Sequence, residues 1–259
     1  MGAVTPNGNT SEFYSLTPEE RRVEVELTVG EAGGRAQVLA GVGQELPTAV
    51  AGARHARDAG AQMVMVHQPV HPYVSGAGWV EYHRAIAAAV PELGVVPYIR
   101  SPLIEGADIA RLGGECPNVI GVKYAVPDPV RFASVARDAG LDRFVWVAGL
   151  AELSAPAYFA CGAKGFTSGL VNVSPKMSLE MLGALRAGDY PAAMTVWEQI
   201  RRFEELRALR QSANNVTVVK EALAALGLCP RAVRPPSALL PEAERAEVAA
   251  IVATWRTGA

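Results

Sequence analysis

The sequence lacks basic runs, long apolar segments and a cysteine framework, and each absence excludes a class of protein. Its 24 basic side chains nearly balance 26 acidic ones, for a formal net charge of −2, whereas nucleic-acid-binding proteins usually have a basic excess. No apolar stretch reaches the ~18 residues of a membrane-spanning helix. The first residues, MGAVTPNGNT, lack the charged and apolar regions of a signal peptide. We therefore expect a cytoplasmic protein with neither a nucleic-acid nor a membrane partner.

Metal and cofactor motifs are absent as well. Cys116, Cys161 and Cys229 have neither a disulfide pattern nor metal-ligand spacing. The sequence contains no glycine-rich phosphate-binding motif and no histidine pair on one helix face. His67 and His71 flank a turn after a strand and could line a polar pocket, with metal binding as the minor alternative. We predict neither a metal nor an organic cofactor.

Short segments rich in valine and isoleucine alternate with segments of helical period, a pattern typical of parallel strands covered by helices. Strands are predicted to begin near residues 3, 36, 62, 94, 118, 143 and 163. Helices are predicted between them over 17–31, 46–59, 78–90, 105–113, 128–139 and 151–161, and later over 177–187, 190–209, 216–226 and 241–254. The strand segments are continuously apolar, which indicates burial on both faces.

This pattern predicts an α/β fold in two parts, a (β/α) barrel over residues 1–175 and a helical domain over 176–259. The barrel part contains seven predicted strands, and a closed (β/α) barrel needs eight. Either the sheet is an open doubly wound one, or the first β/α unit is missing from this sequence.

Three of the four lysines lie in polar or helix-like surroundings, whereas Lys123 lies inside the apolar segment VIGVKYAV. Near the carboxyl end of a parallel strand it would point into the mouth of a barrel, where apolar surroundings lower a lysine pKa from about 10.4 toward neutrality. A neutral amine attacks ketones and forms an imine, which acts as an electron sink. The alternative is a structural lysine that reaches solvent or pairs with a carboxylate.

Two further features lie at the ends of neighbouring strands. Tyr98 ends the preceding strand, so its hydroxyl could move protons for an imine-forming lysine, although simple packing is the alternative. The segment PNGNTSEFYSLT follows the first strand. Gly8 permits a tight turn there, and backbone N–H groups with the Thr10 and Ser11 hydroxyls could bind a carboxylate, although such composition also suits an ordinary turn. Together these features predict a 2-keto acid substrate.

Four segments, GNTSEFYSLTPEER, VPYIR, GVKYA and GAKGFTSGLVNVSP, occur in an order and spacing that resemble the N-acetylneuraminate lyase and dihydrodipicolinate synthase family of Schiff-base enzymes. The resemblance covers essentially the whole chain. It implies a (β/α)8 TIM barrel with a C-terminal helical extension, usually a homotetramer. It also implies an imine between Lys123 and pyruvate or a longer 2-keto acid, with Tyr98 as the proton-relaying tyrosine.

The resemblance also assigns binding residues. The run from Gly8 to Glu12, Gly-Asn-Thr-Ser-Glu, matches the family's Gly-Thr-Thr-Gly-Glu carboxylate loop, and Ser168 matches a small residue near the imine pocket. The predicted substrate-binding residues are Gly8, Asn9, Thr10, Ser11, Arg100 and Ser168. Apart from the resemblance, the side chains expected around the outer pocket include His71, Ser75, Trp79, Arg100 and Glu152, and the sequence assigns none of them a role.

Three departures from the family pattern bear on the substrate. Asn9 replaces the first loop threonine, Val74 replaces a second tyrosine, and Leu103 lies near the position of an arginine, with Arg100 the nearest one. These changes disfavour a lysine-pathway synthase. Asn9 and the segments EFYSLTPEE and NNVTVVKEAL are more similar to the sugar-acid branch, whose dehydratases and aldolases act on 2-keto-3-deoxy acids. We therefore predict a lyase that dehydrates, cleaves or condenses 2-keto acids. The alternatives are dihydrodipicolinate synthase proper and a barrel that binds keto acids or sugar acids without turnover.

Overall fold

The computed structural model describes residues 2–257, which divide into two units. Unit 1 contains residues 2–8, 16–150 and 157–166, and unit 2 contains residues 9–15, 151–156 and 167–257. The two units alternate along the chain. The domain boundary placed at residue 175 from the sequence stays a prediction.

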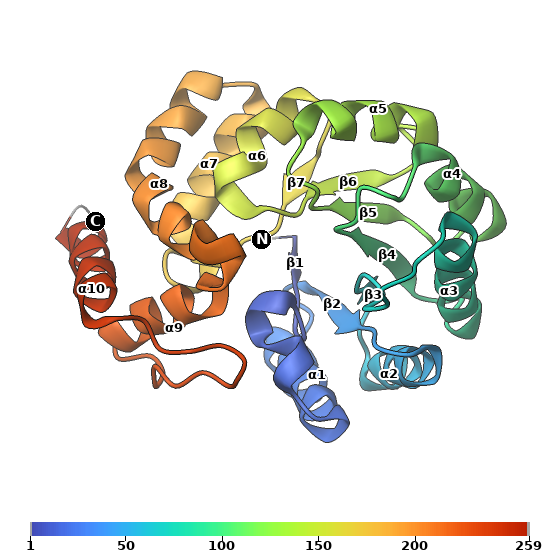
Figure 1. Cartoon of the computed structure of the whole chain (residues 1–259), viewed down its shortest axis with the longest axis horizontal. Helices are drawn as coiled ribbons and strands as arrows, with labels where there is room; N and C mark the ends of the chain where they lie inside the picture. Colours follow the sequence, from blue (N-terminus) through green and yellow to red (C-terminus); the bar gives the residue numbers. More distant parts are fainter. Residues whose placement is uncertain (1, 258–259) are drawn as a thin grey trace. The chain divides into compact units, whose positions relative to one another are not determined.

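Unit 1 is built on a parallel sheet whose seven strands follow one another in sequence order (Figure 1). The strands are β1 (Ala3–Val4), β2 (Gln37–Val42), β3 (Met63–Val66), β4 (Gly94–Ile99), β5 (Gly121–Tyr124), β6 (Val145–Ala148) and β7 (Gly165–Phe166). In the part of the chain that the structure describes, β1 and β7 are the two edges of this sheet. The predicted α/β fold with seven parallel strands is confirmed.

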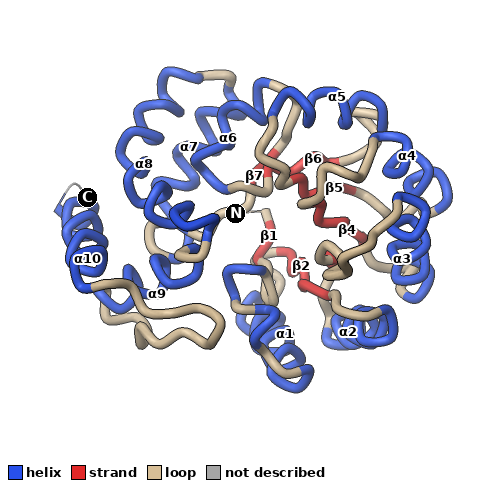
Figure 2. The backbone as a smooth tube through the Cα atoms, viewed as in Figure 1, coloured by secondary structure: helices blue, strands red, loops and turns tan. Residues whose placement is uncertain are grey.

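Five helices of unit 1 alternate with the strands and lie along the outer side of the curved sheet (Figure 2). They are α1 (Pro18–Ala32), α2 (Leu46–Ala59), α3 (Gly76–Ala89), α4 (Gly106–Glu115) and α5 (Pro129–Ala139). All four residues of β5 are buried. Burial on both faces explains why the segment around this strand is apolar apart from Lys123.

The start of α1 illustrates how local sequence sets an element boundary. Thr17 caps the helix, because its hydroxyl accepts a hydrogen bond from the Glu20 amide (3.2 Å) and the Glu20 carboxylate accepts one from the Thr17 amide (2.9 Å). This reciprocal capping box satisfies two amides that would otherwise lack partners. Pro18 occupies the first helical position, where its missing N–H costs nothing.

Unit 2 is helical. It contains α7 (Pro175–Ala187), α8 (Tyr190–Ser212), α9 (Asn215–Ala225) and α10 (Glu242–Thr257), with short 3-10 turns η1 (Asn9–Ser11), η2 (Phe13–Ser15) and η3 (Leu170–Asn172). The α6 helix (Ala151–Ala160) begins in unit 2 and ends in unit 1. The backbone leaves helical geometry at Leu209, the residue at which the sequence predicts the helix to end.

Candidate active site

Lys123 and Tyr98 lie next to each other in unit 1. The parallel register of β4 and β5 pairs Tyr98 with Lys123. The lysine Nζ is 3.9 Å from the centroid of the tyrosine ring. Both side chains are buried, with exposed fractions of 8% for Lys123 and 5% for Tyr98, and Met65 and Ala125 pack with the tyrosine. The structure therefore brings the two predicted catalytic residues together in an apolar setting.

The charge of Lys123 is strongly affected by this setting. Burial, followed by the positive charge of Arg100, lowers the pKa of Lys123 from 10.5 to about 7. At pH 7 about half of such amines are neutral, against about one in 3,000 for a lysine with the unshifted pKa. No carboxylate pairs with Lys123 among residues 2–257, so the carboxylate-paired alternative does not apply. The amine has the properties of a carbonyl nucleophile.

His67 is a neighbour of this pair that sequence reasoning assigned only to a generic polar pocket. It directly follows β3, is 1% exposed, and its ring centroid lies 6.0 Å from that of Tyr98. Its Nε2 donates a hydrogen bond to the Asn7 carbonyl (2.8 Å). Burial and the nearby charges of Lys123 and Arg100 lower the pKa of His67 to about 3. His67 is therefore a neutral imidazole beside the candidate nucleophile.

Backbone packing fixes this link between His67 and Asn7. Asn7 adopts a left-handed conformation at φ 57°, and its Nδ2 donates to the Arg21 carbonyl (2.9 Å). A Cβ atom added at Gly41 would overlap the Asn7 carbonyl and lie 3.0 Å from His67 Nε2. Only glycine lets the chain after β1 approach β2 this closely.

Arg100 follows β4 directly and is exposed. Its backbone amide donates to Gln68 Oε1 (3.3 Å). Its charge lowers the pKa values of both Lys123 and His67. Within the described residues its guanidinium forms no ion pair, so it carries an uncompensated positive charge near the candidate nucleophile.

The predicted carboxylate loop continues from Gly8 in unit 1 into unit 2. Asn9, Thr10 and Ser11 form the 3-10 turn η1 and are partly exposed. The Glu12 amide closes the turn on the Asn9 carbonyl (3.3 Å). Exposed hydroxyls and amides of this kind are suitable for binding an anion.

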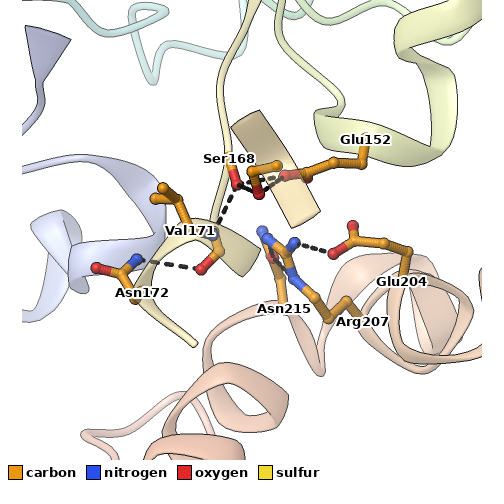
Figure 3. Close-up of polar contacts among 9 residues, drawn as sticks. Glu152, Ser168, Val171, Asn172, Glu204, Arg207 and Asn215 are labelled. Atoms are coloured by element: carbon orange, nitrogen blue, oxygen red, sulfur yellow. Dashed lines mark hydrogen bonds and ion pairs between the residues drawn. The ribbon is translucent and has the colours of Figure 1, made fainter. Parts of the chain in front are cut away.

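Ser168 belongs to a hydrogen-bond network in unit 2 (Figure 3). Its hydroxyl donates to Glu152 Oε1 and accepts from the Val171 amide (2.8 Å). Ser178 donates to the same carboxylate oxygen at 2.6 Å. The structure thus places Ser168 among polar side chains, and its role near an imine stays a prediction.

Glu152 is the centre of this network and is fully buried. Burial, followed by the negative charge of Glu204, raises the pKa of Glu152 to about 7. Arg207 donates to Glu204 (2.6 Å) and to Asn215 (2.7 Å), which compensates the second carboxylate. Glu152 lies in the first turn of α6, where acidic residues are usually exposed. The sequence alone therefore does not indicate that it is buried.

The prediction of an outer-pocket position is wrong for Trp79 and Glu152, which are both fully buried. Glu152 is buried as described, and Trp79 is fully buried in the unit 1 core with its ring centroid 4.1 Å from that of His83. Trp79 is expected at the pocket because it lies shortly after a strand. It instead lies on the face of α3 that packs into the core. Ser75 caps α3 by accepting from the Gly78 amide (3.0 Å). His71 is exposed and contacts the Tyr73 amide (3.1 Å).

Residues 2–257 contain neither a candidate metal centre nor a candidate membrane span. No group of three or more histidine, cysteine, aspartate or glutamate side chains in this part could hold a metal ion. No helix in the same range has the length and apolar character needed to cross a membrane.

Comparisons with known proteins identify the family of this chain. A model of the dihydrodipicolinate synthetase family matches residues 1–254. The chain belongs to the dihydrodipicolinate synthetase family. A similar solved structure is a dihydrodipicolinate synthase from Bacillus clausii, with a TM-score of 0.94 and 40% identity over 99% of this chain and 86% of that one. Another is the synthase from Oceanobacillus iheyensis, with a TM-score of 0.91 and 39% identity over 98% of this chain and 84% of that one.

The curated relatives include sugar-acid dehydratases and a synthase. The chain is 35% identical to a probable 5-dehydro-4-deoxyglucarate dehydratase from Rhizobium rhizogenes, over 97% of this chain and 83% of the relative. It is 34% identical to a 4-hydroxy-tetrahydrodipicolinate synthase from Phenylobacterium zucineum, over 95% of this chain and 83% of the relative. The predicted family and the predicted enzyme class, a lyase of this family, are confirmed.

Proposed function

We propose that this member of the family forms a Schiff base at Lys123 and removes water from a 2-keto-3-deoxy sugar acid. The observation that supports this most strongly is the buried Lys123 amine against the Tyr98 ring, with a pKa lowered to about 7. An amine that is substantially neutral at physiological pH is needed for attack on a ketone.

The relatives indicate which substrate to test first. The compound named for the Rhizobium rhizogenes relative, 5-dehydro-4-deoxyglucarate, has a carboxylate at each end. Its ketone lies beside one carboxylate, and a methylene and a hydroxyl-bearing carbon follow. This is the arrangement that imine chemistry needs for loss of water.

The proposed reaction begins when the neutral Lys123 amine adds to the ketone carbon. The resulting carbinolamine loses water to give a protonated imine. Loss of a proton from the neighbouring methylene gives an enamine, and the enamine expels the hydroxyl of the next carbon, which leaves as water after taking up a proton. Water then adds to the remaining imine and breaks its bond to Lys123, which releases the dehydrated keto acid and restores the free amine. The imine supplies the electron sink, so this scheme requires neither a metal nor an organic cofactor.

Tyr98 is proposed to transfer protons during carbinolamine collapse, because the register of β4 and β5 places it beside Lys123 and the family resemblance assigns it the proton relay. Because His67 stays neutral, it adds no positive charge beside the Lys123 amine. These two residues therefore have separate roles, one chemical and one electrostatic.

Arg100 is proposed to bind a carboxylate of the substrate, since its positive charge has no carboxylate partner in residues 2–257. The family resemblance supports a carboxylate-binding role for Gly8, Asn9, Thr10 and Ser11. Ser168 would line the pocket, again on the resemblance.

A second candidate is condensation of pyruvate with an aldehyde, the activity of dihydrodipicolinate synthases. The 40% identity to the Bacillus clausii synthase favours it. Val74 and Leu103, at positions where the sequence departs from the synthase pattern, are the observations against it.

Three finer features belong to the same proposal. The seven strands of unit 1 would be seven of the eight strands of a (β/α)8 barrel. The family resemblance supports a homotetramer and a cytoplasmic location.

Turnover of a panel of 2-keto acids tests the function. The panel contains 5-dehydro-4-deoxyglucarate, a monocarboxylic 2-keto-3-deoxy sugar acid, and pyruvate with an aldehyde, and the products are followed by mass spectrometry. We expect loss of water from a sugar acid, abolished in Lys123→Ala and retained in the control Lys176→Ala, which changes an exposed lysine of α7. Turnover of pyruvate with the aldehyde alone would favour the second candidate, and binding without turnover of any compound would refute the enzyme proposal.

A further inference from the structure

Glu12, at the end of the predicted carboxylate loop, has both carboxylate oxygens bonded within unit 2. Its Oε2 pairs with the Lys220 ammonium of α9 at 2.9 Å. Its Oε1 accepts from the backbone amide of Arg234 at 2.7 Å. The Glu12 side chain is 13% exposed and that of Lys220 is 27% exposed. These three groups, the Glu12 carboxylate, the Lys220 ammonium and the Arg234 amide, are called the loop clamp below.

The loop clamp holds a strained residue. Glu12 has φ 57°, the left-handed region that glycine tolerates and a glutamate adopts only at a cost in free energy. Its amide closes the η1 turn on the Asn9 carbonyl (3.3 Å), and its carbonyl accepts from the Ser15 amide (2.7 Å). A change in the Glu12 backbone would therefore be transmitted directly to the turn that carries Thr10 and Ser11.

A second set of contacts ties the same segment to the chain after α9. The Ser15 hydroxyl donates to the Pro235 carbonyl (3.2 Å), and the Arg234 guanidinium donates to the Ser15 carbonyl (3.2 Å). These partners are more than 200 residues apart in sequence. Contacts of this range are made only in the folded protein, so the conformation of residues 9–15 depends on α9 and on the segment that follows it.

We propose that Glu12 and Lys220 are positioning residues that hold Asn9–Ser11 in the conformation that binds the substrate carboxylate. This inference rests on the proposed function, because it assumes that the loop binds substrate. Without the Lys220 charge, the partly buried Glu12 carboxylate would lose its cation and turn toward water, which relieves the backbone strain and lets the η1 turn adopt other conformations. A loop that must be reordered on binding weakens affinity without changing the chemical groups at Lys123.

The surroundings of Lys220 allow this to be tested without unfolding the protein. A cavity of about 330 Å³ borders Lys220, Cys229 and Arg234, so a side chain at position 220 has space to adjust. Lys220→Met keeps the aliphatic length and removes the charge, and Lys220→Arg keeps the charge. The matched control is Arg231→Met, which removes an arginine that pairs with Glu221 (3.3 Å) in the same region of unit 2.

Hydrogen exchange and imine trapping together test the clamp. We expect Lys220→Met to speed amide exchange of residues 9–15 by about tenfold, and to raise the half-saturating pyruvate concentration for trapping of Lys123 by a similar factor, with the maximal trapping rate within about twofold of the wild type. Lys220→Arg should restore both values, and Arg231→Met should change neither.

Each contrary result has a separate meaning. Unchanged exchange in Lys220→Met would overturn the clamp itself. Faster exchange with an unchanged half-saturating concentration, or a loss confined to the maximal rate, would overturn the positioning role. Absence of trapping in the wild type would refute the proposed function and with it the substrate part of this inference, whereas the exchange comparison would still decide whether the clamp exists.

Discussion

The lowered pKa of Lys123 makes a quantitative prediction about its reactivity between pH 5 and pH 10. A pKa of about 7 in place of 10.5 is a shift of 3.5, or about 5 kcal/mol in favour of the neutral amine. Because only the neutral form reacts, the reactivity of Lys123 should rise about ninefold between pH 5 and pH 6, about fivefold between pH 6 and pH 7, and only about twofold between pH 7 and pH 9. An unshifted lysine would gain about a hundredfold over that last interval.

Trace labelling with an amine-specific acylating reagent measures this profile. Peptides that contain Lys123 are quantified by mass spectrometry against peptides that contain Lys176, an exposed lysine that serves as the internal standard. Arg100→Met should move the Lys123 midpoint to higher pH, because it removes a neighbouring positive charge. A Lys123 profile that rises in parallel with that of Lys176 up to pH 10 would refute the reasoning.

Four further predictions concern other residues. Tyr98→Phe keeps the ring against Lys123 and removes the hydroxyl, so kcat should fall about a hundredfold or more in steady-state assays, and an unchanged kcat would contradict the proton-transfer role. Arg100→Met should raise the KM of a dicarboxylic substrate about tenfold while changing that of pyruvate little, and equal effects on both would argue against carboxylate binding. Gly41→Ala forces a Cβ atom into the Asn7 carbonyl and should lower the free energy of unfolding in urea by about 1–3 kcal/mol. The folded-state pKa of Glu152 lies above its ordinary value, so the stability that its protonation contributes is lost as pH rises from 5 to 8. The stability of Glu152→Gln relative to the wild type should therefore increase by about 2 kcal/mol over that range, and a constant difference would show that Glu152 does not titrate there.

The regular elements could be predicted because their signals are local. The capping pattern at Thr17 and the apolar strand segments depend on residues close in sequence, and the structure has these elements near the expected positions. The pairing of Tyr98 with Lys123 could also be anticipated, since the carboxyl ends of adjacent parallel strands lie together.

The remaining features depend on contacts between distant residues. Nothing near Glu152 in sequence indicates that Ser168, Ser178 and Glu204 surround it in a buried network. The bond from His67 to the Asn7 carbonyl spans 60 residues, and its geometry depends on the missing side chain of Gly41. Such features arise from packing, so periodicity and motifs do not predict them.

The central claim is that Lys123 forms an imine with a 2-keto acid. Borohydride reduction in the presence of pyruvate, followed by peptide mapping, tests it most directly. A reduced pyruvate adduct should appear on the peptide that contains Lys123 and should be absent from Lys123→Ala, while Lys176→Ala should be labelled like the wild type. No adduct on the intact wild-type protein, or equal labelling of Lys123→Ala at another lysine, would contradict the claim.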